Sequence, residues 1–287
     1  MSDRSHGVGF FDGGLGDIVR IIYQSDAYRW LSGVTSPTPV VVASGNPFSV
    51  EIFRCHRNSG NFVIYDLSRK RQLLMAEGLR GIECHQALCD FAGLRHSDIV
   101  RGLPPEGYSP IFDAPDDIDS DGHFVLQPFS GSNDARSWHP KFIERVVAAL
   151  RFQPRRTFLL TRNFIRQDSA GRVVHAVEDA RPFEGGNITV LDNLSVPGAL
   201  NLVKRSTAYV GSWSSLHQAA WLEGKPVAVF YQPKNVDVMR RTAYAFGLDR
   251  PDCLHADYPK FDEGAFTAWV ANPFQRFGPS NDYRDHR

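Results

Sequence analysis

The run from Tyr209 to Phe230 constrains the fold of this chain more than any other segment. Its apolar start leads into a loop of small and hydroxyl residues, Gly211–Ser215, and then into a helix that extends to about Leu222. Gly224 stands where helices commonly end, and a second apolar stretch follows at 226–230. Two apolar strands that flank one helix predict parallel strands joined by a crossover.

The loop at the start of this helix has the composition of an anion site. The hydroxyls of Ser212, Ser214 and Ser215, with the backbone N–H groups near Gly211, can face a phosphate, and the helix dipole adds to the attraction. His217, one turn into the helix, can donate to the same group. A structural role is the alternative: Ser212 or Ser214 caps the helix and His217 packs as a polar residue of the core.

The same strand–loop–helix pattern repeats along the chain. Strands are predicted at 7–11, 39–43, 62–65, 124–127, 157–161, 188–191, 208–210 and 226–230. Further helices are predicted at 18–31, 48–58, 70–79, 84–92, 141–150, 196–205, 236–246 and 263–271. Ser195 is a plausible cap of the helix at 196, and Pro140 suits the first turn of the helix at 141. The pattern predicts an α/β protein with parallel sheets.

A polar connector between 102 and 122 divides this pattern into two halves. Four prolines and the acidic run 116–121 make it unsuited to a helix. We therefore predict an N-terminal Rossmann-like domain at 1–115 and a C-terminal one at 122–287. Two such domains predict a cleft, with ligands bound at the carboxyl ends of the strands.

The composition excludes several classes of protein. Lysine and arginine number 32, as do aspartate and glutamate, so the formal net charge is zero. This argues against affinity that comes from covering a nucleic-acid backbone, although a local basic groove is compatible with it. No apolar run has the length of a membrane span, and the N-terminus lacks a signal-peptide core. The four cysteines lack CxxC and zinc-ligand spacing, which predicts free thiols, no metal site and a cytoplasmic protein.

A second candidate loop follows the strand at 124–127. Ser130 and Ser132, with Gly131 between them, can donate to phosphate oxygens, and Arg136 offers a planar cationic fork for the same group. Trp138 is better explained as packing that orients the loop than as a stacking platform. A surface turn with a solvated arginine is the structural alternative.

The third candidate loop follows the first strand and contains Gly13, Gly14, Gly16 and Asp17. Its spacing departs from the dinucleotide pattern GxGxxG, so a nicotinamide cofactor is not predicted. The glycines can instead let the backbone approach a substrate while Asp17 accepts a proton from an attacking hydroxyl. An ordinary first-turn aspartate, favoured by the helix dipole, is the alternative.

Taken in order, the three loops resemble the motifs of the family-9 glycosyltransferases, the heptosyltransferases of lipopolysaccharide synthesis. That family has a small-residue loop ending in Gly-Asp, a segment from a proline to Lys-x-Trp-Pro, and a Gly-x-Asp-Ser/Thr-Gly-x-x-His loop. The corresponding residues here are Gly16-Asp17, the segment from Pro128 to Pro140, and the segment from Gly211 to His217. The chain departs from the family at Ser212, where the family has Asp, and at Arg136, where it has Lys.

The resemblance implies a GT-B fold, in which two Rossmann-like domains face each other across a cleft. It also implies an inverting, metal-independent glycosyltransferase without a cofactor, which moves a sugar from a nucleotide-diphosphate sugar to a hydroxyl of a glycan or other acceptor. Asp17 would be the catalytic base, and Gly13, Gly14 and Gly16 would belong to the acceptor-side loop.

The residues implied at the donor diphosphate are Ser130, Gly131, Ser132, Arg136, Gly211, Ser212, Ser214, Ser215 and His217. Two alternatives remain open. One is a sugar-nucleotide epimerase or hydrolase on the same fold, and the other is a non-catalytic module that binds nucleotide sugars.

Overall fold

The computed structural model describes residues 7–24, 26–99, 109–129, 138–167, 173–178, 180–231, 253–257 and 261–274. The chain divides into two compact units, one made of 1–118 with 195–201 and the other of 119–194 with 202–287. Each unit is built on its own parallel sheet, which confirms the predicted α/β class. The grouping of 195–201 with the first unit was not predicted. It follows from contacts of Asp116 and Phe112 with Ser195 and Asn201, respectively.

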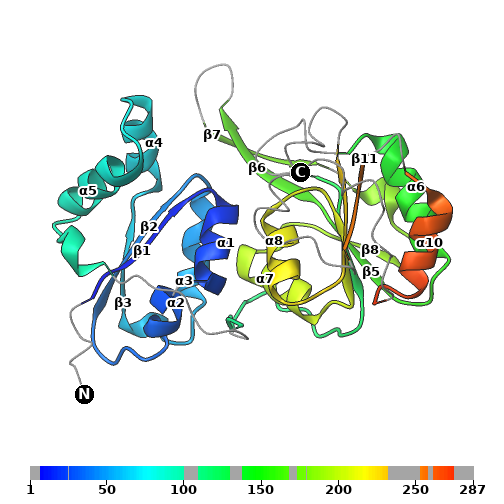
Figure 1. Ribbon diagram of the computed structural model, residues 1–287, viewed down its shortest axis with the longest axis horizontal. Helices are drawn as coiled ribbons and strands as arrows, with labels where there is room; N and C mark the ends of the chain where they lie inside the picture. The colour runs from blue at the N-terminus through cyan, green and yellow to red at the C-terminus, as the bar shows by residue number, and fades with distance from the viewer. Residues whose placement is uncertain are drawn as a thin grey trace, which may run out of the picture. The chain divides into compact units, whose positions relative to one another are not determined.

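The first unit holds a three-stranded parallel sheet in the order β1-β2-β3 (Figure 1). Its strands are β1 (Gly9–Gly13), β2 (Thr38–Ser44) and β3 (Phe62–Asp66). The helices are α1 (Leu15–Gln24), α2 (Asp26–Leu31), α3 (Val50–Arg54), α4 (Ser68–Ala76) and α5 (Gly81–Phe91). Because the strands are parallel, the loops after β1, β2 and β3 all leave the same edge of the sheet.

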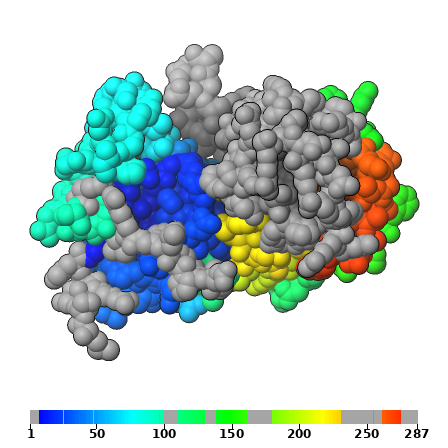
Figure 2. Space-filling model, viewed as in Figure 1, coloured from blue at the N-terminus to red at the C-terminus, as the bar shows by residue number. Residues whose placement is uncertain are grey.

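The two faces of this sheet are covered by different helices. Phe11 points to the face where Tyr28 of α2 and Phe53 of α3 lie, with ring centroids 6.3 and 4.5 Å from its own. Phe10 points to the other face and packs in a cluster with residues of α4 and α5 such as Leu74 and Leu88. This alternation is what a strand buried on both faces requires. The outer sides of α4 and α5 are visible in cyan in Figure 2.

The second unit holds a six-stranded parallel sheet in the order β11-β10-β9-β4-β5-β8. The strands are β4 (Phe124–Gln127), β5 (Thr157–Leu160), β8 (Ile188–Leu191), β9 (Ala208–Gly211), β10 (Val227–Tyr231) and β11 (Cys253–Asp257). The chain adds strands outward from β4 on one side and then returns to add β9 on the other. This is the doubly wound order of a Rossmann fold, and its switch point lies between β4 and β9.

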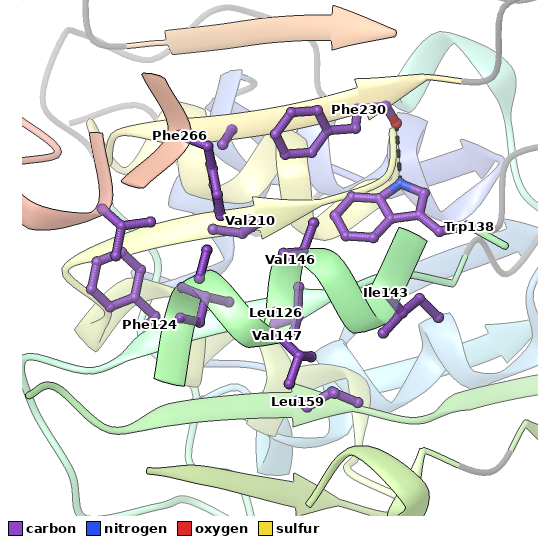
Figure 3. Packing of buried hydrophobic residues seen from close by; sticks show 14 of the residues in the cluster. Phe124, Leu126, Trp138, Ile143, Val146, Val147, Leu159, Val210, Phe230 and Phe266 are labelled. Carbon is purple, nitrogen blue, oxygen red and sulfur yellow. Dashed lines mark hydrogen bonds between the residues drawn. The ribbon is translucent and has the colours of Figure 1, made fainter. Parts of the chain in front are cut away.

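Helices cover both faces of the second sheet. The helices α6 (Pro140–Arg151) and α10 (Glu263–Ala271) lie on one face, and α8 (Ser215–Leu222) lies on the other (Figure 1). Figure 3 shows the core beneath α6, where the Trp138 indole Nε1 donates to the backbone oxygen of Phe230 at 3.1 Å. Trp138 is 3% exposed, so it packs in the core, as predicted. In the described part of the chain, no helix is both long and apolar enough to cross a bilayer.

Several local predictions are confirmed. Gly224 follows α8 with φ +71°, the left-handed conformation of a helix-ending glycine. Ser195 caps α7 (Val196–Arg205), since its Oγ accepts from the N–H of Gly198 at 3.1 Å. Pro140 is the first residue of α6.

Of the other predictions, some were wrong and one lies outside the described residues. The helix expected at 48–58 is a 3-10 turn, Pro47–Ser49, followed by α3, which ends at Arg54. Tertiary contacts override its pattern, because the Asn58 amide donates to the backbone oxygen of Ser32 at 2.8 Å. The antiparallel hairpin of β6 (Arg162–Gln167) and β7 (Val173–Glu178) was not predicted, nor was β11. The single helix expected at 18–31 is described as α1 and α2. The helix expected at 236–246 lies outside the described residues.

His56 is a buried imidazole held in its neutral form. The residue is only 3% exposed, and its Nδ1 accepts a hydrogen bond from the backbone N–H of Asn58 at 3.0 Å. Its Nε2 lies 3.3 Å from the Ser32 hydroxyl. Burial, and then the charge of Arg57, lower the pKa of His56 from 6.5 to about 4, against a smaller opposing effect of Asp113. Protonation would also remove the acceptor of the Asn58 bond.

This histidine predicts an acid-sensitive fold. Because the folded pKa lies below the unfolded one, its contribution to stability is complete above pH 6.5. It is then lost as the pH falls toward about 4. Between pH 7 and pH 5 the wild type should lose about 2 kcal/mol more unfolding free energy than His56→Gln. Urea denaturation at both pH values measures this, and equal losses in the two proteins would contradict it.

Candidate functional site

The loop after β1 folds back on itself around Asp17. Gly13 has φ +113°, and a Cβ built on it would lie 2.7 Å from the Cβ of Asp17. The N–H of Gly14 donates to Oδ2 of Asp17 at 3.0 Å, and the N–H of Gly45 in the loop after β2 donates to the oxygen of Gly13 at 2.7 Å. Only glycine allows this path at position 13. Gly16 lies within the first turn of α1.

Asp17 itself performs the role of a helix-capping residue. Its Oδ2 accepts from the N–H of Gly14, as the third residue of a capping box does, and its Oδ1 lies 3.3 Å from Nη2 of Arg20. The side chain is nevertheless 55% exposed. The structural alternative for Asp17 is therefore realised, and its carboxylate stays accessible to a ligand. Its role as a base remains a proposal.

A second carboxylate at the end of β1 was missed by the sequence analysis. Asp12 lies on the same face of β1 as Phe10, and its Oδ2 contacts Nε2 of His85 on α5. The His85 ring also packs on Phe10, with centroids 5.1 Å apart. The Asp12 and His85 side chains are 22% and 28% exposed. An acidic residue that ends an otherwise apolar strand was the available signal, whereas His85 gave none, because its partner is distant in sequence.

The two strands that lead into the predicted phosphate-binding loops flank the switch point of the second sheet. The loop after β4 and the loop after β9 leave adjacent strands, because Gln127 and Gly211 are register partners. Ligands of doubly wound folds bind at this place, outside the carboxyl ends of the strands. A Cβ on Gly211 would lie 2.6 Å from the oxygen of Gln127 and 2.5 Å from the phenol oxygen of Tyr209. Position 211 therefore admits only glycine.

Ser214 is the N-cap of α8, as one of the two sequence interpretations predicted. It has extended backbone angles, φ −152° and ψ 176°, and its Oγ accepts from the N–H of His217 at 3.2 Å. The N–H groups of Ser215 and Leu216 have no acceptor within the helix, since they belong to its first turn. Ser214 and Ser215 are partly exposed. The cap and an anion site are therefore compatible in this loop.

The other two polar side chains of this loop lie in the interior. Ser212 is fully buried, and its Oγ has no hydrogen-bond partner in the described part of the protein. His217 is also fully buried, with its ring 4.7 Å from that of Trp213 and 6.3 Å from that of Tyr209. His217 thus matches the packed polar residue of the structural interpretation. Direct contact of these two side chains with a diphosphate stays a prediction.

A hydrogen-bond network behind the loop was missed by the sequence analysis. Oε1 of Gln127 accepts from the Tyr209 phenol at 2.8 Å and from the Ser214 hydroxyl at 2.7 Å. The phenol oxygen also lies 3.2 Å from the backbone oxygen of Ser212, so its single proton is shared between the two acceptors. Burial raises the pKa of Tyr209 far above its ordinary value, so the phenol stays a neutral donor. The available signal was one residue with a polar group in each of two otherwise apolar strands, Gln127 in β4 and Tyr209 in β9.

The remaining predicted donor residues lie outside the described residues. These are Ser130, Gly131, Ser132 and Arg136. The described end of their loop is anchored by Trp138, and His139 caps α6 by accepting from the N–H of Lys141 at 3.3 Å. The described residues contain no group of three or more His, Cys, Asp or Glu side chains that could hold a metal ion.

No protein-family model matches this chain, and no curated protein matches its sequence. Among solved structures it is similar to E. coli heptosyltransferase WaaC with ADP, at TM-score 0.49 and 11% identity over 91% of this chain and 96% of WaaC. It is similar to E. coli ADP-heptose LPS heptosyltransferase II at TM-score 0.47 and 12% identity, over 78% of this chain and 85% of that one.

A third similar structure is the iron-containing dodecameric glycosyltransferase TibC from enterotoxigenic E. coli, at TM-score 0.41 and 12% identity. The match covers 81% of this chain and 60% of TibC, so the chain spans less than two thirds of that protein.

Alanine substitutions at the two neighbouring glycines where β1 leads into α1 should differ in their effect on stability. Gly13→Ala should lower the unfolding free energy by about 1–3 kcal/mol, because it combines a left-handed φ with a clash against Asp17. Gly14→Ala should change it by less than about 0.5 kcal/mol, since its Cβ would meet only Oδ2 of Asp17, at 3.5 Å. Urea denaturation of both variants measures this. Equal destabilisation by the two would show that the described loop path is wrong.

Proposed function

We propose that this protein is a glycosyltransferase that moves a sugar from a nucleotide-diphosphate sugar to an acceptor hydroxyl, with inversion and without a metal. The observation that carries the proposal is the small-residue loop that enters α8 at the switch point of the second sheet. The resemblance of the three loops to the family-9 motifs, which rests on the residues themselves, supports the same reaction class.

On the donor side, the diphosphate is bound by backbone and hydroxyl donors. The N–H groups of Ser215 and Leu216 and the partly exposed Ser215 hydroxyl lie in the first turn of α8. The positive end of the helix dipole is at this N-terminus. Gly211 and Ser214 shape this loop, while Ser212 and His217 support it from the interior. Ser130, Ser132 and Arg136 of the loop after β4 add hydroxyls and a positive charge. Each well-placed donor of this kind contributes roughly 3–4 kcal/mol as charge develops on the leaving group.

On the acceptor side, Asp17 is the general base. The acceptor O–H bond breaks and its proton moves to the Asp17 carboxylate, while the acceptor oxygen bonds to the anomeric carbon. The bond from that carbon to the diphosphate oxygen breaks, and the nucleoside diphosphate leaves with the electron pair. The hydrogen bond from Gly14 and the nearby Arg20 hold the carboxylate in place before the reaction.

A binding screen followed by a turnover assay tests this function. The first step measures thermal shifts with ADP, UDP, GDP, CDP and dTDP and with their sugars, since ligands of the folded state raise the melting temperature. The second step incubates any stabilising donor with and without hydroxyl acceptors. Product formed from donor alone would indicate an epimerase or hydrolase. Binding without any turnover would indicate a non-catalytic module, and no shift with any nucleotide would refute the donor site.

Asp17→Asn separates the base from the cap. The amide oxygen can still accept from Gly14, but the residue can no longer accept a proton, so turnover should fall by about 10²–10⁴. Nucleotide binding and the unfolding free energy should stay near wild type. The matched control is Asp26→Asn, which alters the first-turn aspartate of α2. A fully active Asp17→Asn enzyme would exclude Asp17 as the base.

Arg136→Ala tests the charge that the loop after β4 contributes. Losing a charge-assisted contact to the diphosphate should weaken nucleoside diphosphate binding by roughly tenfold to a hundredfold. The control is Arg145→Ala, since Arg145 pairs with Glu263 at 2.7 Å. Calorimetric titration with the nucleotide found in the screen measures both. Unchanged affinity in Arg136→Ala would remove this residue from the donor site.

A further inference from the structure

Gln127 stands where the two donor-side loops diverge. It is the last residue of β4, and it is partly exposed after three buried strand residues. Its backbone oxygen accepts from the N–H of Ser212 at 2.9 Å, so its main chain also holds the loop after β9. Gln127 therefore leads into the loop after β4 and is hydrogen-bonded to the loop after β9.

The amide oxygen of Gln127 is fixed from two sides. Oε1 accepts from the phenol of Tyr209 at 2.8 Å and from the hydroxyl of Ser214 at 2.7 Å. Both donors are themselves held, because Tyr209 is fully buried and the Ser214 Oγ accepts from the N–H of His217. In this arrangement both hydroxyls donate to Oε1, which directs Nε2 away from them.

The other end of this amide has no acceptor in the part of the chain that the structure describes. Among the described residues, the Nε2 of Gln127 donates to no acceptor, although the rest of the side chain is bonded. Because the Gln127 side chain is partly exposed, the two N–H groups of Nε2 are accessible to a ligand. The amide lies at the carboxyl edge of the strands that flank the switch point, where the first-turn N–H groups of Ser215 and Leu216 also lack an acceptor inside the helix.

We propose that Gln127 binds the donor directly, with its Nε2 donating to a diphosphate oxygen, and that Tyr209 is the positioning residue that aims this amide. The inference rests on the proposed nucleotide-sugar site and adds to it a residue from the opposite side of the switch point. Tyr209 acts only through Gln127 and the loop, since its phenol is buried and bonded to Gln127, Ser212 and Ser214.

Inorganic pyrophosphate is the probe, because it is the part common to all nucleoside diphosphates. Its affinity for the full chain is measured by calorimetric titration, with the melting temperature recorded for each protein. Gln127→Met removes both the donor and the acceptor at similar volume, and Tyr209→Phe removes only the positioning hydroxyl. Asp262→Ala is the matched control, since it deletes an equivalent N-cap, the one that accepts from Ala265 at 3.0 Å in α10.

Gln127→Met should weaken pyrophosphate binding about tenfold or more, and Tyr209→Phe about twofold to fivefold. Asp262→Ala should lower the melting temperature and leave the affinity unchanged. Equal losses in Gln127→Met and Tyr209→Phe would overturn direct contact, because both would then act through the loop alone. Losses that simply follow melting temperature, in the control as well, would overturn both roles.

A second variant protects the test against misfolding of Gln127→Met. Gln127→Glu keeps an oxygen for Tyr209 and Ser214 but replaces the donating Nε2 by a second oxygen. It should fold like the wild type and bind pyrophosphate at least about tenfold more weakly. Wild-type affinity in this variant would overturn the proposal. Failure of the wild type itself to bind pyrophosphate would instead refute the proposed donor site, so the two failures are distinguishable.

Discussion

The parallel pairing of β4 with β9 is the contact on which the second unit depends. It joins the first strand of the unit to the strand that begins its second half, and it brings Gln127 opposite Gly211. Both strands are buried on each face, and α6 and α10 complete the core on one of them. Because the strand order reverses here, this is the position at which doubly wound sheets bind their ligands. The closeness of the strands at this point requires the absence of a side chain at position 211.

The hydroxyl groups of a loop can form hydrogen bonds within the protein instead of binding a ligand. In the loop after β9, Ser214 is engaged by Gln127, Tyr209 and the N–H of His217, and Ser212 is buried. What this loop offers to an anion is therefore chiefly backbone, shaped by side chains that face inward. The loop after β1 follows the same logic, since Asp17 secures the turn through Gly14 and remains largely exposed. In both loops a structural contact prepares the group that is proposed to act.

The sequence predicted the repeating architecture, but not the interactions that fix the site. Apolar runs of strand length, Gly224 and Ser195 carry local information, so the sheets and caps followed from them. The hairpin of β6 and β7 was missed because its insertion between β5 and β8 interrupts the strand–helix alternation that guided the prediction. The contacts of Asp12 with His85 and of Gln127 with Tyr209 join residues far apart in the chain. Spacing along the sequence cannot show such pairs, because tertiary packing alone brings them together.

The two-sided attachment of Gln127 has a consequence for how this protein can diverge. Its main chain is bonded to Ser212, and its side chain to Tyr209 and Ser214. Ser212 takes part only through its backbone, so its side chain is not tied to the others. Loss of the side-chain group at Gln127, Tyr209 or Ser214 leaves its partners with an unmatched group, so changes that do not replace that group in kind are best tolerated together. In related sequences these positions should therefore vary as a set, while the residues that line the rest of the sheet edge vary one at a time. Such joint variation would let these residues change without the loop losing its shape.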